Sequence, residues 1–261
     1  MKVFTTANTK FLFKNIGILI FYLLIWQFAY TIVQKDLYLP SPWQVLQRLA
    51  ELVRELHFWQ AVAFSMYRVG WGIALSVVAG VVLGVIAGWS NLCYNLLQPL
   101  VTAIKSTPVI SFIIIALIWF SSFNAPVFIC ILMCFPIIWT NIVTGIRQVD
   151  QKLLEMAQVY RVKRPAVWHR IYLPSLLPYF TAAVVTSLGL GWKVSVAAEV
   201  LSHPQHAIGS QLNSSKVYMD AGGLFAWTLV VIFLSLLLEK ILAHCLNKLN
   251  KRGSGYAKDQ D

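Results

Sequence analysis

The chain has 261 residues, of which 58% are hydrophobic and only 12% are charged, and its formal net charge is +11. A soluble domain needs about a quarter of its residues charged to cover its surface, so this composition excludes an ordinary soluble protein and predicts a membrane protein. The positive charges lie between apolar segments, which favours the positive-inside rule over nucleic-acid binding as their explanation.

The first apolar segment, residues 11–33, is long enough to cross a bilayer, which takes about 20 apolar residues. A cleavable signal peptide is the alternative, but signal cores hold only ~7–15 apolar residues. No A-x-A cleavage site follows this segment. We therefore expect a cytoplasmic tail over residues 1–10 and a retained transmembrane helix within residues 11–36.

Residues 37–58 are expected to form an amphipathic helix on the external membrane interface. Two prolines bracket Ser41, which is a suitable N-cap, and Pro42 suits the first turn of a helix. Apolar residues then recur at helical spacing: Leu46, Leu49, Val53 and Leu56.

A ridge of small residues runs along residues 69–89, a segment without any charge. A small residue occupies every fourth position: Gly72, Ser76, Gly80, Gly84 and Gly88. Such a ridge lets the backbone of another helix approach closely, and close approach is how helices associate in lipid. We expect this helix to pack in the middle of a bundle.

The rest of the transmembrane core is expected within residues 59–246. Residues 106–146 carry no charge and are too long for one span, and the stretch SSFNAP at 121–126 supplies a turn. The spans expected in this part are 97–120 (kinked near Pro108), 126–146, 176–200 and 222–245, which brings the total to six.

Six spans place both termini on one side of the membrane. With this topology 15 of the 21 Lys and Arg fall on that side, in the N-terminal region, the turn 89–105, the segment 147–170 and the C-terminal end. The positive-inside rule makes that side cytoplasmic. The tail 247–261 and the basic segment 147–175 are therefore expected in the cytoplasm.

The basic segment 147–175 is expected to form two short helices. Asp150 can cap the first helix, Pro165 suits the first turn of the second, and Pro174 is expected to end it. A solvated loop that only sets topology is the alternative, but such a loop needs neither caps nor an apolar stripe. The pattern favours a docking surface.

This segment resembles the EAA loop of ABC-importer permeases, because Glu155 and Ala157 precede an Ile-x-Leu-Pro that begins sixteen residues after the glutamate. Further stretches resemble the nitrate/sulfonate/taurine branch: LPSPWQV at 39–45, Ser65-x-x-Arg68-x-x-x-Gly72, Asn141 with Gly145-x-Arg147, Val149-Asp150, and Trp192 with Ala198-Glu199. The resemblance implies an all-α membrane protein with six transmembrane helices in the type I importer-permease fold. It also implies coupling helices that seat in a groove of an ATPase subunit, with the coupling residues Glu155, Ala157, Arg161, Leu173 and Pro174.

Two positions in the loop depart from the family pattern. Met156 replaces an alanine, which is a mild change, and Arg161 stands where the family has glycine. Glycine adopts a positive φ at little cost and arginine does not. We therefore expect the turn at Arg161 to use another backbone geometry.

The chain has no G-x-x-x-x-G-K-[ST] stretch, so ATP must be bound by a separate subunit and no cofactor is expected in the chain itself. The resemblance implies a pair of ATPase subunits, a second permease copy in a homodimer, and an extracytoplasmic solute-binding protein. It places the complex in the cell's inner membrane. The implied cargo is a small anion of the nitrate, sulfonate or taurine kind, and a vitamin precursor or another organic solute is the alternative.

Three charged residues near the outer half of the expected spans are candidates for the translocation path, since charged residues within spans are functional candidates by default. Arg68 and Glu199 could share one depth, and we expect them to pair near the external mouth. Lys193 lies ~9 Å deeper along its helix. It either faces the path or extends outward to lipid headgroups.

Two other classes of protein fit the sequence less well. An intramembrane enzyme needs a nucleophile–base pair or a metal site, and neither H-E-x-x-H nor G-x-S-x-G occurs. His203 and His206 flank a proline without a nearby carboxylate or cysteine, so no metal or catalytic residue is assigned. Secondary transporters usually show internal repeats and more spans.

Overall fold

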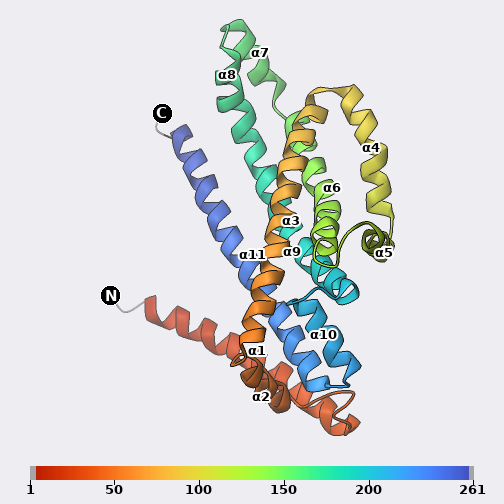
Figure 1. Cartoon of the computed structure of the whole chain (residues 1–261). Coiled ribbons are helices and arrows are strands. Elements are labelled where there is room, and N and C mark those ends of the chain that lie inside the picture. Colours follow the sequence, from red (N-terminus) through yellow and green to blue (C-terminus); the bar gives the residue numbers. More distant parts are fainter. Residues whose placement is uncertain (1–3, 259–261) are drawn as a thin grey trace. The chain divides into compact units, whose positions relative to one another are not determined.

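The structure is a computed structural model that describes residues 4–258, with side chains described at 17, 18 and 20–244. Every regular element of the described chain is a helix (Figure 1). The chain divides into two compact units, Met1–Trp59 with Gln211–Val230, and Gln60–Ser210 with Val231–Asp261.

Four helical stretches are long and apolar enough to cross a membrane: Leu56–Trp89, Ala125–Arg147, Arg164–Ser202 and Ala221–His244. A fifth span results if the bent pair α4 (Asn91–Ser106) and α5 (Val109–Trp119) is counted as one. Helix α1 (Phe4–Val33) contributes a shorter apolar stretch, Ile20–Val33. The expected six spans therefore require both the bent pair and α1. Since α1 begins at Phe4, most of the expected tail 1–10 is helical.

The prediction of a single helix over residues 97–120 is wrong. Two helices occupy this region, with an angle of 105° between α4 and α5. Thr107 is extended at the break, with φ −86° and ψ 134°, because the proline that follows it disfavours helical geometry. Pro108 also lacks the N–H that a continuous helix would use. The bend is a break, and not the kink that the sequence predicted.

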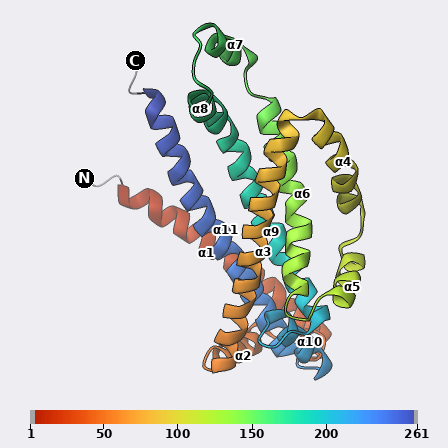
Figure 2. The ribbon, with the colours of Figure 1, turned by 45° about the horizontal axis from the view of Figure 1, so that its top comes forward.

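The ridge of small residues on α3 (Leu56–Trp89) packs against α6 (Ala125–Arg147), and both views show these helices side by side (Figure 2). A Cβ atom on any of the four glycines would lie closer to an α6 side chain than real atoms approach. The distances are 2.6 Å from Gly72 to Cys130, 2.7 Å from Gly80 to Ile138, 2.9 Å from Gly84 to Ile142 and 2.8 Å from Gly88 to Ile146. Ser76 donates a hydrogen bond of 3.2 Å to the Ile131 carbonyl. Glycine is thus required along this contact.

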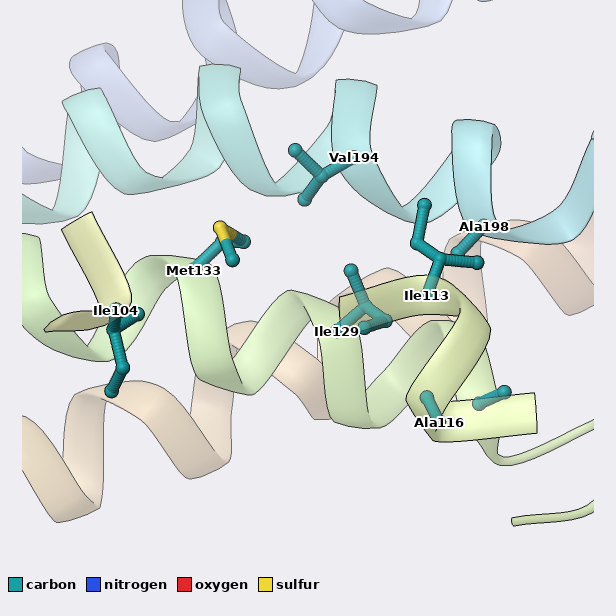
Figure 3. Close-up of a cluster of buried hydrophobic side chains, with 8 residues drawn as sticks. Ile104, Ile113, Ala116, Ile129, Met133, Val194 and Ala198 are labelled. Carbon is teal, nitrogen blue, oxygen red and sulfur yellow. The ribbon is translucent and has the colours of Figure 1, made fainter. Parts of the chain in front are cut away.

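Helix α6 also packs along α9 (Leu173–Ser202), and α4 and α5 cover the same region. One buried apolar cluster joins the four helices (Figure 3). It contains Ile104 of α4, Ile113 and Ala116 of α5, Ala125, Ile129 and Met133 of α6, and Val194 and Ala198 of α9. Helix α6 is therefore the centre of this unit.

The other unit contains α2 (Pro42–Leu52), part of α10 (Ile208–Val217) and the first turns of α11 (Ala221–Lys258). The predicted start of α2 is confirmed, because Ser41 accepts from the Gln44 N–H while the Gln44 side chain accepts from the Ser41 N–H. Asp220 accepts from the Gly223 N–H at the start of α11 and forms an ion pair of 3.2 Å with Arg48. Since α11 continues to Lys258, most of the expected tail 247–261 is helical too.

Candidate functional site

The segment that resembles a coupling loop lies at the end of its unit where α6 ends and α9 begins (Figure 1). Its first helix, α7 (Gln151–Val159), is capped as predicted, because Asp150 accepts from the Lys152 N–H at 2.9 Å. Ala157 is buried, whereas Glu155 is exposed. Several large apolar side chains of this region are uncovered, among them Met156 at 51%, Val159 at 79% and Tyr160 at 76% exposure.

The turn after α7 keeps the geometry that glycine would favour. Arg161 has φ +53°, its N–H donates to the Gln158 carbonyl at 3.0 Å, and the Val162 N–H donates to the Ala157 carbonyl at 2.9 Å. These two hydrogen bonds form a Schellman motif with Arg161 at the left-handed position. The expectation of another backbone geometry is therefore wrong. The hydrogen bonds hold the arginine in a conformation that costs an L-residue roughly 1–2 kcal/mol.

The second short helix does not end at Pro174 as predicted. Helix α8 (Arg164–Val167) continues through a π-helical turn, Trp168–Tyr172, directly into α9. In the π-helical turn the Leu173 N–H donates to the Trp168 carbonyl five residues earlier. This wider turn accommodates a proline at the next residue, and such turns are frequent at functional sites. Leu173 and Pro174 are both exposed there.

An aromatic cluster anchors the segment to the end of α3. The rings of Trp89 and Trp168 lie 5.1 Å apart, and Tyr172 lies 5.5 Å from Trp168 and 5.7 Å from Trp89. The three side chains also line a groove of about 780 Å³ between α7 and α8, together with Arg161 and Arg164. The sequence alone did not predict this cluster. It shows only that aromatic residues occur at the end of α3 and in the π-helical turn, and not that they meet.

The predicted pairing of Arg68 and Glu199 is present, and both side chains are fully buried. The Arg68 Nη1 donates to Glu199 Oε1 at 2.9 Å. The other carboxylate oxygen of Glu199 accepts from Ser65 Oγ at 2.8 Å and from the Gly209 N–H at 3.1 Å. The carboxylate is thus hydrogen-bonded at both oxygens, while Arg68 Nε has no partner among the described residues. Hydrogen bonds to both charged groups are what makes a buried ion pair tolerable.

The same network extends into the turn between α9 and α10. Arg68 Nη2 donates to the Gln205 carbonyl at 3.0 Å, and the Ile208 N–H donates to Ser65 Oγ at 3.0 Å. A Cβ atom at position 209 would lie 2.4 Å from the Cβ of Glu199, so only glycine fits there. The ion pair therefore joins α3, α9 and the first turn of α10.

The structure does not bring Lys193 into this network. Lys193 is exposed, and it forms no ion pair within the described part of the chain. Its neighbour Trp192 is fully buried and donates to the Val231 carbonyl at 3.1 Å. The three path candidates are thus one buried pair and one separate exposed lysine. No metal-binding group of three ligands occurs among the described residues, which include His203 and His206.

Comparisons with known proteins find similar chains. A family model described as binding-protein-dependent transport system inner membrane component matches residues 80–251. The taurine transport system permease protein TauC of Escherichia coli (strain K12) is 25% identical over 232 residues, covering 86% of this chain and 84% of that protein. The nitrate import permease protein NrtB of Leptolyngbya laminosa is 30% identical over 146 residues, covering 56% of this chain and 52% of that protein.

The fold also has a counterpart among solved structures. An inward-facing structure of the MetNI methionine ABC transporter contains a chain that aligns with a TM-score of 0.55 at 15% identity. The alignment covers 75% of this chain and 93% of that chain. The similarity shows a shared fold, in agreement with the type I importer-permease architecture expected from the sequence.

Replacement of Arg161 by glycine is expected to stabilise the segment formed by α7, the turn after it and α8, which we call the coupling segment. Glycine removes the left-handed penalty at φ +53°, a gain of about 1 kcal/mol, while the two backbone hydrogen bonds remain. We expect slower amide exchange in α7 of the Arg161→Gly protein. Tyr160→Gly is the control, because φ is −80° there and glycine relieves nothing. Equal amide exchange rates of α7 in the two variants would contradict the claim that the backbone at Arg161 is strained.

Arg68 and Glu199 are expected to be strongly coupled in stability. Arg68→Met or Glu199→Gln alone leaves a buried polar group without its partner, at a cost of about 3–5 kcal/mol for a broken buried pair. The double variant should therefore lose much less than the two single losses combined. Thermal unfolding of the four purified proteins measures this difference. Additive losses would show that the two side chains contribute independently.

Proposed function

We propose that this chain, which belongs to the family of inner membrane components of binding-protein-dependent transport systems, forms half of the membrane path for a small anionic solute. The exposed α7–α8 segment is the observation that carries the proposal. Helix α7 lies outside the candidate spans, and α8 begins the span Arg164–Ser202. Helix α7 nevertheless presents uncovered apolar side chains around an exposed Glu155. Exposed apolar groups of this kind mark interaction surfaces.

Family membership makes the chain the permease subunit of an ATP-driven ABC importer, and not an enzyme. Its partners are an ATPase subunit and a solute-binding protein, and its location is a membrane that it crosses several times. The ATPase must be supplied by another chain because this sequence has no phosphate-binding loop.

The finer assembly is part of the proposal. The importer would contain two copies of this permease and two ATPase subunits, with both permease termini in the cytoplasm. Each ATPase subunit would bind the α7–α8 segment of one permease. Glu155, Ala157, Arg161, Leu173 and Pro174 would shape that contact. The positive charge of Arg161 at the turn also makes an ATPase surface with complementary acidic residues the expected partner.

The proposed cargo follows from charge and from the relatives. Taurine carries a sulfonate group and nitrate is an oxyanion. Both solutes appear in the names of similar permeases. The charged residues inside the spans of this chain include Lys193, which is exposed and can meet an anion. The buried Arg68–Glu199 pair would hold the external gate, since it joins α3 to the turn after α9.

A charge reversal at Glu155 tests the coupling role. Glu155→Lys places a cation on the proposed ATPase contact while leaving the buried Ala157 face of α7 intact. We expect at least about a tenfold loss of ATP-driven uptake in proteoliposomes, with normal yield and helix content of the permease, because a basic ATPase group that complements Glu155 would then face a like charge. ATP hydrolysis by the complex should no longer respond to the loaded binding protein.

Glu55→Lys is the matched control, because Glu55 is also exposed and lies outside the coupling segment. Its uptake should equal that of the unmodified complex. Coupled uptake by the Glu155→Lys complex at the control level would refute the proposed coupling role. The substrate question is separate: uptake of a vitamin precursor without any uptake of anions would refute the anionic cargo alone.

A further inference from the structure

A second pocket lies between α4 and α6, away from the coupling segment. Its volume is about 200 Å³, below the roughly 300–1,000 Å³ of sites for drug-sized ligands. We call it the α4–α6 pocket. It is lined by Tyr94, Gln98, Val101, Thr102, Lys105, Trp139, Thr140, Val143 and Thr144.

The position of Lys105 differs from the sequence-based expectation. The topology count assigned Lys105 to a cytoplasmic turn, but it belongs to the last turn of α4, fourteen residues after Asn91. That separation corresponds to ~21 Å along the helix. Lys105 Nζ donates to Thr140 Oγ1 at 2.8 Å, so its side chain is turned toward the central helix α6. The ammonium group thus lies beside α6 at a point ~10 Å before its last residue, Arg147. An ionisable group within a span is a functional candidate.

Lys105 has no counter-ion on the helices around it. From Asn91 to Arg147 the sequence contains two charged residues, Lys105 and Arg147, and no Asp or Glu. Arg147 follows Thr140 by seven residues at the end of α6, where it donates to Asn91 at 3.1 Å and stacks over Tyr94 at 4.0 Å. Glu199 of α9 is bound to Arg68. The ammonium group therefore lacks the negative partner that a charge within a span normally requires.

Donors exceed acceptors in the pocket. Lys105 has three N–H groups, and one of them is bonded to Thr140. The indole of Trp139 is 1% exposed, and its Nε1 has no hydrogen-bond partner among the described residues. Thr102 accepts from Gln98, which leaves the Thr102 hydroxyl hydrogen available. Lys105 and Thr102 are exposed, whereas the Trp139 indole is a buried donor without a partner among the described residues. A bound ion or water is one explanation for such a donor.

We propose that the α4–α6 pocket binds the oxyanion group of the transported solute, with Lys105 as the charge and Trp139 and Thr102 as further donors. A nitrate ion or a sulfonate supplies three acceptor oxygens and one negative charge, which matches both the donor surplus and the missing counter-ion. The proposal rests on the proposed function of anion transport. A lipid phosphate has the same chemistry and is the other source of such an anion.

Charged thiol reagents test the pocket without requiring transport. The complete complex would carry Thr102→Cys in a background in which Cys93 and Cys245 are replaced by serine, since Cys130 and Cys134 are buried. Methanethiosulfonates with a sulfonate or a trimethylammonium group would be compared. A cation near the introduced thiol should favour the anionic reagent, and Lys105→Met should lower the anionic-to-cationic rate ratio roughly tenfold. Lys105→Arg should retain the ratio, and so should Lys152→Met, a control on α7.

Competition identifies what the pocket binds. Sodium nitrate and taurine should slow the anionic reagent when Lys105 is present and have no effect in the Lys105→Met complex. The measurement is repeated in phosphatidylcholine nanodiscs and in lipid-free detergent. Protection by nitrate or taurine in both supports a solute site. A ratio that is unchanged by Lys105→Met overturns the proposal, as does a ratio that rises only when phospholipid is removed, because the lysine then binds lipid.

Uptake distinguishes the pocket from the proposed function. Proteoliposomes with the binding protein and ATPase subunits should import labelled nitrate or taurine, and Lys105→Met should reduce uptake at least about tenfold while Lys105→Arg retains it, because only the arginine keeps the charge. Import of an anion by the unmodified complex and equally by Lys105→Met would overturn the pocket and leave the proposed function intact. If the unmodified complex imports no anion, the proposal of an anionic cargo is refuted. The labelling experiment would still decide whether the pocket binds anions.

Discussion

The close contact between α3 and α6 is the constraint on which the larger unit depends. In lipid there is no hydrophobic driving force for apolar helices to associate, so their association must come from close packing and from polar contacts. Four glycines and one serine at intervals of four residues remove the side chains that would separate the two backbones. Because α6 also packs along α9, the position of α3 determines which residues of α3 can meet α9.

The buried ion pair is a consequence of that contact. Arg68 lies one helical turn before Gly72, which contacts α6. The close packing of α3 on α6 therefore brings the Arg68 side chain within reach of Glu199 on α9. The carboxylate is satisfied by Ser65, Arg68 and the Gly209 N–H, and the guanidinium also donates to the turn after α9. A change in the distance between α3 and α9 would break several hydrogen bonds together. The pair is therefore suited to a gate with two defined states.

Several features were predictable because they depend on residues near one another in the sequence. The caps at Ser41 and Asp150 each use hydrogen bonds within three residues, and the ridge follows from helical spacing alone. The Arg68–Glu199 pair could be inferred from matching depths in two antiparallel spans. These arguments need the helix period and the span direction, and nothing about the tertiary contacts.

Other features depend on competition between local preference and context. Arginine disfavours the left-handed region, yet the Schellman hydrogen bonds after α7 hold Arg161 there. Pro174 is a helix breaker by composition, but a π-helical turn carries the chain past it. The 105° break at Pro108 and the position of Lys105 are linked, because one continuous helix with a kink at Pro108 was expected there. Its start was placed at residue 97, whereas α4 begins at Asn91.

The stability of two glycine variants on the same helix tests the central claim most directly. Gly80→Leu inserts a side chain whose Cβ alone would lie 2.7 Å from Ile138. Gly70→Leu adds the same atoms where a Cβ would have nothing within 4 Å. The account predicts that Gly80→Leu loses more than about 3 kcal/mol, the upper range of overpacking, and yields little assembled complex. Gly70→Leu should resemble the unmodified protein. Equal thermal stability and assembly of the two variants would contradict the claim that the α3–α6 contact positions the rest of the unit.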